Sequence, residues 1–268
     1  MTGLDDRVLA AVDEFGPSAV EERPDRLRVF FHDKESRDRA LQSVRALDAG
    51  LVIEALEVSD EAWAERSQTA LTPVTVGRIV VSPPWSTKDL PLESAPIVLT
   101  IQPSMGFGTG HHPSTRMCLR LLQLESMKDA SLLDVGTGSG VLAIAGVALG
   151  ATRVVAIDHD LDALQSAREN VELNGMADRI DLRVVDLVDE PATFGAEFDV
   201  LTANLTGAML ERHARTLTGW ANGRGSVIAS GFQEDEEPMV RAAFDAIGWS
   251  MAARVTEQGW LGVALRRR

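Results

Sequence analysis

Apolar residues in the first part of this chain recur at helical spacing in two segments and cluster into short runs around them. Three- and four-residue spacing predicts an amphipathic helix, and a short apolar run predicts a strand. In chain order the expected elements are a helix at 4–15, a weaker strand at 18–22, a strand at 27–31, a helix at 40–47 and a strand at 51–56. Residues 1–58 are therefore expected to form a small α+β domain.

A charged stretch follows this first domain. Ser59 and Asp60 are typical of a helix start, and the helical pattern ends before Pro73. We expect a linker helix over residues 59–73 and a second domain over residues 74–268.

In this second part, strand-like and helix-like stretches alternate. After two β-branched strands at 79–81 and 97–101, the expected order is helix 114–124, strand 132–135, helix 141–149, strand 153–157, helix 160–174, strands 180–185 and 200–201, helix 208–220, strand 226–229 and helix 238–247. Two last strands, 251–255 and 260–265, lie too close together for a helical crossover and predict an antiparallel hairpin at the sheet edge. The pattern indicates an α/β fold, a mainly parallel sheet with helices on both faces.

Charge and composition narrow the class of protein. The chain has 26 Lys and Arg against 40 Asp and Glu, a net charge of −14, so no nucleic-acid partner is expected. An acidic surface suits a basic protein substrate, and it equally serves solubility alone. No signal-peptide pattern and no apolar run of membrane-spanning length is present, so a cytoplasmic protein is expected. The single cysteine, Cys118, lies in an apolar helical pattern typical of a buried thiol.

A glycine-rich loop carries the first chemical signal. Gly136, Gly138 and Gly140 lie where a strand turns into a helix, and such a loop lets the backbone approach a nucleotide-type cofactor. Dinucleotide enzymes carry G-x-G-x-x-G, whereas this loop has G-x-G-x-G. Asp134 stands before the loop, where it suits the ammonium of S-adenosylmethionine and would repel a pyrophosphate. Asp158 ends the next strand and can accept both ribose hydroxyls. These features favour S-adenosylmethionine over a nicotinamide cofactor.

Two further strand ends point at the same site. Asp186 could lie near the adenine amino group, and a solvated loop aspartate is an equal alternative. Asn204 follows the fourth strand, where it could bind the cofactor or the incoming amine; an asparagine turn is the alternative.

The most distinctive segment is residues 104–116, S-M-G-F-G-T-G-H-H-P-S-T-R. Phe107 could stack on cofactor or substrate. Together with D-x-G-x-G-S-G and the A-N-L segment around Asn204, it resembles the bacterial ribosomal protein L11 methyltransferases, the PrmA family, over about residues 57–268. Three departures concern substrate recognition or the A-N-L segment: the chain opens almost directly with a helix, Ser67 replaces a usual linker tryptophan, and Thr206 follows Leu205.

This resemblance implies cofactor contacts at Thr115, Gly136, Asp158 and Asn204. It also implies a seven-stranded Rossmann-like methyltransferase domain, a small N-terminal substrate-recognition domain, and methylation of lysine and N-terminal amines on a basic ribosomal protein. Asn204, Thr109 and His111 are the candidates near the acceptor amine. No metal is expected, because the adjacent His111 and His112 side chains of an extended loop point apart. We expect a monomer.

Three rival functions remain open at this point. The first is a methyltransferase for another protein or a small metabolite, because the N-terminal domain departs from the family. The second is a nicotinamide-dependent oxidoreductase, against which the glycine spacing and Asp134 count. The third is a binding module without activity, against which the intact loop counts. Base methylation of nucleic acid is not favoured, because the chain lacks an N-P-P-Y motif at Asn204.

Overall fold

The computed structural model describes residues 8, 11–12, 15, 19–23, 26–31, 34–47, 51, 53, 55, 71–87, 97–103, 110–189, 194–195 and 197–268. The chain divides into two compact units, Met1–Trp63 and Ala64–Arg268. The division falls inside the segment predicted as a linker, and residues 59–70 of that segment lie outside the described residues. The predicted domain limits 1–58, 59–73 and 74–268 therefore stay predictions.

The first unit contains a hairpin and a helix. Strands β1 (Ala19–Arg23) and β2 (Arg26–Phe30) pair antiparallel, and α2 (Lys34–Leu47) carries Ala40 and Val44 into a small core with Val12. The weak strand predicted at 18–22 is therefore real. The strand predicted at 51–56 is wrong where it can be checked, because Leu51, Ile53 and Ala55 belong to no strand. Leu51 and Ile53 pack on the core all the same, which explains their apolar pattern.

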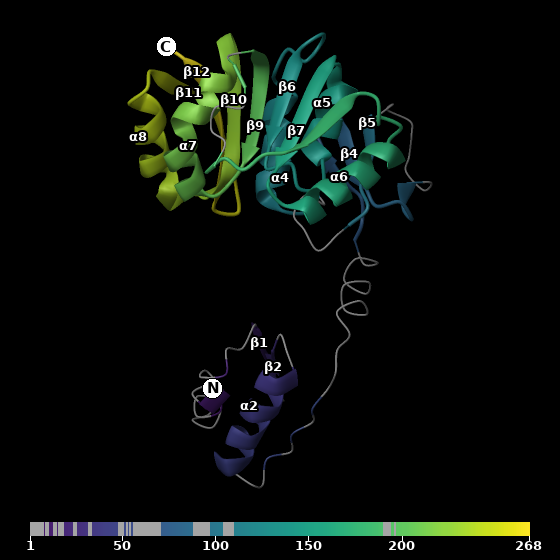
Figure 1. Cartoon of the computed structure of the whole chain (residues 1–268), viewed down its shortest axis with the longest axis vertical. Helices are drawn as coiled ribbons and strands as arrows, with labels where there is room; N and C mark the ends of the chain where they lie inside the picture. The colour runs from purple at the N-terminus through teal and green to yellow at the C-terminus, as the bar shows by residue number, and fades with distance from the viewer. Residues whose placement is uncertain are drawn as a thin grey trace. The chain divides into compact units, whose positions relative to one another are not determined.

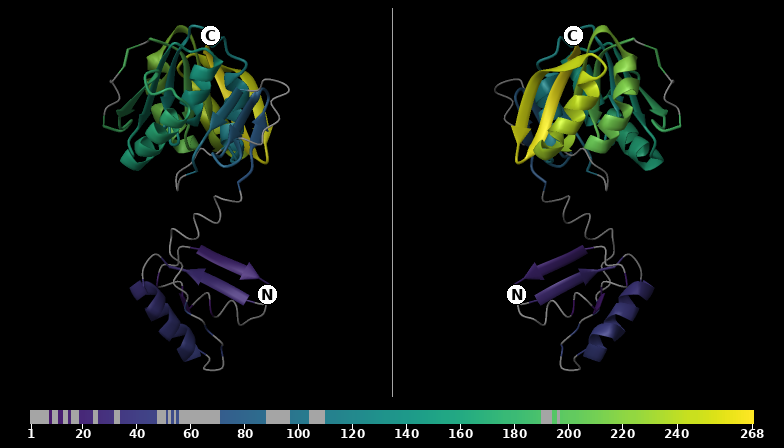
Figure 2. Two further views of the ribbon diagram at one scale, coloured as in Figure 1. Left: turned by 90° about the vertical axis from the view of Figure 1, so that its right-hand side faces the viewer. Right: turned by 90° about the vertical axis from the view of Figure 1, so that its left-hand side faces the viewer.

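The second unit is built on a seven-stranded sheet (Figure 1). Its strands are β6 (Ser131–Val135), β7 (Arg153–Asp158), β8 (Ile180–Val184), β9 (Phe198–Asn204), β10 (Ala221–Gln233), β11 (Trp249–Glu257) and β12 (Trp260–Arg267). Their spatial order is β11-β12-β10-β9-β6-β7-β8. Strands β10, β9, β6, β7 and β8 run parallel to one another, and β12 is antiparallel to both of its neighbours, β10 and β11. The predicted parallel sheet with a terminal hairpin is confirmed. In the right-hand view of Figure 2 the yellow hairpin faces the viewer.

Five helices of the described chain cover the two faces of this sheet. They are α4 (Pro113–Leu122), α5 (Val141–Leu149), α6 (Leu161–Leu173), α7 (Gly207–Trp220) and α8 (Glu237–Asp245), the last preceded by the short 3-10 helix η3 (Glu234–Glu236). Successive strand residues point to opposite faces, so Leu132 joins the core under α4 and α5 while Leu133 joins the core under α7 and α8. Cys118 of α4 is fully buried, as predicted. None of the described helices is long and apolar enough to cross a membrane.

A second, three-stranded sheet belongs to the core of α4 and α5. Strands β3 (Val74–Val76) and β4 (Ile79–Ser82) pair antiparallel, and β4 pairs parallel with β5 (Ile97–Thr100). Ile79 and Leu99 are fully buried in that core. β5 therefore delivers the chain to the start of the glycine-containing segment 104–109.

Candidate active site

The glycine loop lies at the point where the strand order reverses. From β6 the chain runs outward to β7 and β8, then returns to β9 on the other side of β6. In open α/β sheets, ligands bind at such a switch point, outside the carboxyl ends of the strands. Gly136 directly follows the last residue of β6, so the cofactor loop predicted from the sequence lies at this switch point.

The loop needs its glycines for backbone reasons. Gly136, Gly138 and Gly140 have φ of 69°, 53° and 80°, in the left-handed region that side chains with a Cβ rarely adopt. A Cβ on Gly136 would lie 2.7 Å from Cδ2 of Leu205. The amides of Gly136 and Thr137 donate to the Ile157 carbonyl at 2.9 and 3.0 Å, which ties the loop to β7.

Asp134 is the buried carboxylate of the site. Its side chain is 1% exposed, and its oxygens accept hydrogen bonds from Oγ1 of Thr137 and Oγ1 of Thr202, each at 2.6 Å. Burial raises the pKa of Asp134 to about 6, although these two hydroxyls favour the charged form. The carboxylate thus ties the loop to β9. It also holds a negative charge away from water, where a ligand cation would offset the cost of burial.

Asp158 and Asp186 lie at the ends of the next two strands. Asp158 is 8% exposed, and its carboxylate accepts from the amides of Gly138 at 3.0 Å and Asp160 at 3.1 Å. Asp186 is half-buried and accepts from the Val188 amide at 2.7 Å. The Val185 amide donates to the Asp158 carbonyl, which brings the two strand ends together. Their predicted contacts with ribose and adenine stay predictions.

Asn204 ends β9 beside Ser230 of β10. Ser230 is fully buried, and its hydroxyl donates to the Leu261 carbonyl at 2.8 Å. The Leu205 amide donates to the Ser230 carbonyl, and a Cβ on Gly231 would come within 2.4 Å of the Leu205 carbonyl oxygen. The close approach of these two backbones fixes where the half-buried Asn204 stands.

The start of α4 faces the same edge of the sheet through Trp260. His112 is the N-cap of α4: its Nδ1 lies 2.7 Å from Oγ of Ser114, and its ring packs edge-on against Trp260 at 4.4 Å between centroids. Trp260 pairs with Gln233 at the carboxyl end of β10. Thr115, in the first turn, is 1% exposed. Burial, together with the nearby Arg116 charge, lowers the pKa of His112.

Arg116 fixes the chain just before this helix. Its guanidinium donates to the carbonyls of Gly110 and His111, and it also pairs with Glu257 of β11 at 2.6 Å. Arg120, one turn later, pairs with the same carboxylate at 3.0 Å. The predicted residue His111 is therefore held at its backbone.

The structure places most of the predicted site residues at the carboxyl edge of the sheet. Asp134, Gly136, Gly138, Asp158 and Asn204 surround one switch point, with Asp186 one strand further out. Phe107 and Thr109 lie outside the described residues. Within the described part of the chain, no three His, Cys, Asp or Glu side chains gather into a metal-binding group.

Sequence reasoning missed two hydroxyls and one arginine. Thr202 stands two residues before Asn204, so strand alternation could have placed it on the face of Asp134. Thr137 lies inside the glycine motif itself. Arg116, a charge that directly precedes the apolar residues Met117, Cys118 and Leu119 of the helix, was a further signal.

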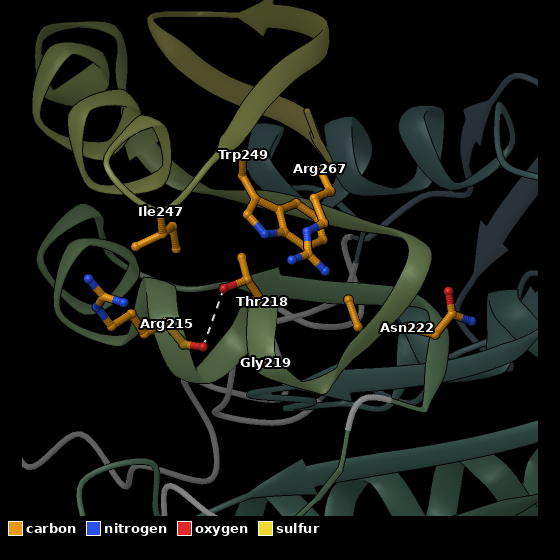
Figure 3. Close-up of a pocket in the computed structure, with 8 residues that line it drawn as sticks. Arg215, Thr218, Gly219, Asn222, Ile247, Trp249 and Arg267 are labelled. Carbon is orange, nitrogen blue, oxygen red and sulfur yellow. Dashed lines mark hydrogen bonds between the residues drawn. The ribbon is translucent and has the colours of Figure 1, made fainter.

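A hollow of about 290 Å³ lies at the opposite edge of the sheet (Figure 3). Ala221 and Trp249, at the amino ends of β10 and β11, line it with Arg215, Thr218 and Arg267. Because the glycine loop lies at the carboxyl ends, this hollow is separate from the cofactor loop.

Comparison with known proteins gives the family. The model of the ribosomal protein L11 methyltransferase (PrmA) family matches residues 5–268. Ribosomal protein L11 methyltransferase of Geotalea uraniireducens is 31% identical over 96% of this chain and 87% of its own length, and that of Deinococcus radiodurans is 31% identical over 95% and 92%.

A solved structure agrees with the family. The ribosomal protein L11 methylase of Lactobacillus delbrueckii subsp. bulgaricus superposes with a TM-score of 0.67 at 27% identity, over 74% of this chain and all of that one. The predicted resemblance and fold class are confirmed: the chain belongs to the ribosomal protein L11 methyltransferase family.

Proposed function

We propose that this protein transfers methyl groups from S-adenosylmethionine to lysine side chains or to the N-terminal amine of a basic ribosomal protein of the L11 type. The observation that carries the proposal is the buried carboxylate of Asp134 beside three left-handed glycines at the switch point. In a chain of this family, that arrangement suits a cofactor with a cationic amino-acid end and a ribose.

The residues present fit that cofactor by their chemistry. Asp134 would hold the ammonium, since a buried carboxylate stabilises a nearby cation. Asp158 would accept the ribose hydroxyls, and its attachment to the Gly138 amide fixes the carboxylate for that task. We propose that three further residues complete the cofactor pocket: Thr115, Asp186 and Phe107.

The chain's own task in the reaction is alignment. S-adenosylmethionine, when bound, supplies a methyl group activated by the positive sulfonium. Asn204, at the end of β9, would orient the acceptor nitrogen, with Thr109 and His111 nearby. A lysine with an ordinary pKa near 10.4 must lose its proton first, which a site shielded from water favours. Holding the amine in line then supplies most of the remaining acceleration.

Charge supports a basic protein substrate. With a net charge of −14, the protein attracts cationic partners over long range and repels nucleic acid. We propose that it acts as a cytoplasmic monomer on the ribosomal protein itself, without direct contact with nucleic acid.

The test is methylation of a purified L11-type ribosomal protein. Incubation with S-adenosylmethionine is expected to raise its intact mass by whole methyl units, and peptide mapping should place them on lysine or the N-terminal amine. Asp158→Asn should reduce the rate strongly, whereas Asp160→Asn, an exposed helix-cap change on the same loop, should not.

Two results would contradict the proposal. Cofactor binding without a mass gain on the ribosomal protein would point to another protein or a small metabolite as acceptor. Calorimetry that shows binding of NAD and none of S-adenosylmethionine would restore the oxidoreductase hypothesis.

A further inference from the structure

Two asparagines, Asn170 within α6 and Asn174 at its C-cap, form hydrogen bonds with backbone groups outside the helix. Asn170 is fully buried, and its Nδ2 donates to the Ser139 carbonyl of the glycine loop at 2.9 Å. Its Oδ1 accepts from the Gln102 amide at 2.7 Å. One side chain thus joins the glycine loop to the chain that leaves β5.

Asn174 forms the same kind of contact with the chain at β5 and has no hydrogen bond to the glycine loop among the described residues. Its Oδ1 accepts from the Thr100 amide at 2.9 Å and its Nδ2 donates to the Thr100 carbonyl at 2.7 Å. Residues four apart in a helix are separated by about 6 Å along the axis, and residues two apart in a strand by about 6.6 Å. The spacing lets Asn170 and Asn174 meet Gln102 and Thr100 in register, so the helix satisfies the strand edge as a neighbouring strand would.

Described residues on both sides of segment 104–109 have hydrogen-bond partners. On the amino side Gln102 is tied to α6, and on the carboxyl side the Gly110 and His111 carbonyls are tied to Arg116. Of the two asparagines, only Asn170 also reaches the glycine loop.

We propose that Asn170 is a positioning residue that holds the glycine loop against the chain that leaves β5 at Gln102, in the arrangement that binds S-adenosylmethionine. The inference rests on the proposed function, since it concerns the same cofactor. Asn170 itself is buried under the loop and acts through the Ser139 carbonyl and the Gln102 amide. When it is lost, the glycine loop and the chain at Gln102 separate more often, and the apparent affinity for cofactor falls with the fraction of molecules whose loop is in place.

The matched pair Asn170→Leu and Asn174→Leu tests this role. Both variants lose hydrogen bonds to the strand edge, and both should show a lower melting temperature. Only Asn170→Leu should bind S-adenosylmethionine about tenfold more weakly, a difference of about 1.4 kcal/mol. Its cofactor KM should rise by a similar factor, while kcat at saturating cofactor stays within about twofold. Equal affinity in the two variants would overturn the proposal.

A second measurement uses the unaltered protein, in case Asn170→Leu does not fold. Cofactor should slow hydrogen exchange at the Gln102 amide more than at the Thr100 amide, because only Gln102 shares a partner with the glycine loop. No slowing at Gln102 despite measured cofactor binding would overturn the role of Asn170. Failure of the unaltered protein to bind cofactor would instead overturn the proposed function and this inference with it.

Discussion

The carboxyl and amino edges of the seven-stranded sheet differ in the polarity of their buried side chains. At the carboxyl edge, Asp134 and Thr202 are almost fully buried polar side chains. Toward the amino edge, the large apolar side chains of Phe198, Trp220 and Trp249 are buried beside the small polar residue Ser226, and charged groups are exposed. Burying polar groups costs free energy unless each finds a partner, so a sheet under selection for stability alone would make both edges apolar. The contrast is what we expect if the carboxyl edge holds the proposed cofactor site.

Each edge also has a glycine in the left-handed region, and these two glycines give the largest expected effect. Gly231 has φ of 93°, and a Cβ there would lie 2.4 Å from the Leu205 carbonyl oxygen; Gly248 has φ of 81° and open space around it. Gly231→Ala combines backbone strain with overlap that only backbone movement relieves, so we expect a loss of roughly 3 kcal/mol or more. Gly248→Ala should lose about 1 kcal/mol from strain alone.

Urea unfolding of both variants measures the difference. Gly231→Ala should also lose methylation activity, because Leu205 follows Asn204 directly. If the two variants were equally stable, the close approach of β9 and β10 would not be a constraint.

The second effect concerns two aspartates, one at each edge. Asp134→Asn keeps the shape and leaves the Thr137 and Thr202 hydroxyls free to rotate, but removes the charge. We expect cofactor affinity to fall between about tenfold and about a hundredfold, as for a lost charged hydrogen bond, with an unchanged or higher melting temperature. Asp199 accepts from the Ser131 amide and from Asn222, so Asp199→Asn should change stability alone. Calorimetry with both variants checks this, and unchanged affinity in Asp134→Asn would remove its role at the ammonium.

The same pair predicts opposite responses to acid. Burial raises the pKa of Asp134 to about 6, above its unfolded value near 3.9, so the folded state binds this proton more tightly. Its contribution to stability therefore grows by roughly 2–3 kcal/mol as pH falls from about 6 to about 4. Cofactor affinity should fall over the same range, because the carboxylate is neutralised.

Asp199 responds in the other direction. Partial burial alone would raise the pKa of Asp199, but the hydrogen bonds that its carboxylate accepts outweigh burial and lower this pKa. The stability that the charged carboxylate contributes is therefore lost as pH falls below the ordinary pKa of an aspartate. Melting temperatures against pH, compared between the unaltered protein and Asp134→Asn, isolate the buried group. A pH-independent difference between those two proteins would contradict the shift.

The local sequence pattern was sufficient to predict most helices and strands, but not the contacts between residues that are far apart in the sequence. Alternation predicted the strands and the covering helices of the seven-stranded sheet, whereas the short strand β3 was not predicted. Turn geometry together with the G-x-G-x-G spacing located the glycine loop. Predicting that an Asp134 oxygen meets Thr202 required knowing that β6 lies beside β9, which the sequence of one strand does not contain. The same holds for Asn170, whose partners are 31 and 68 residues away. The apolar run at 51–56 was misread because packing on a core needs no strand.

The smallest expected effect belongs to the hollow at the amino edge. Arg215 and Arg267 line it, both are exposed, and neither forms an ion pair with any described residue. Exposed side chains without specific partners change stability by no more than about 0.5 kcal/mol when replaced. Arg215→Gln and Arg267→Gln should therefore keep wild-type melting temperature, cofactor affinity and methylation rate, measured as for Asp134→Asn. A reduced methylation rate toward the ribosomal protein with unchanged cofactor affinity would show instead that the amino edge contacts the substrate. Function would then not be confined to the carboxyl edge.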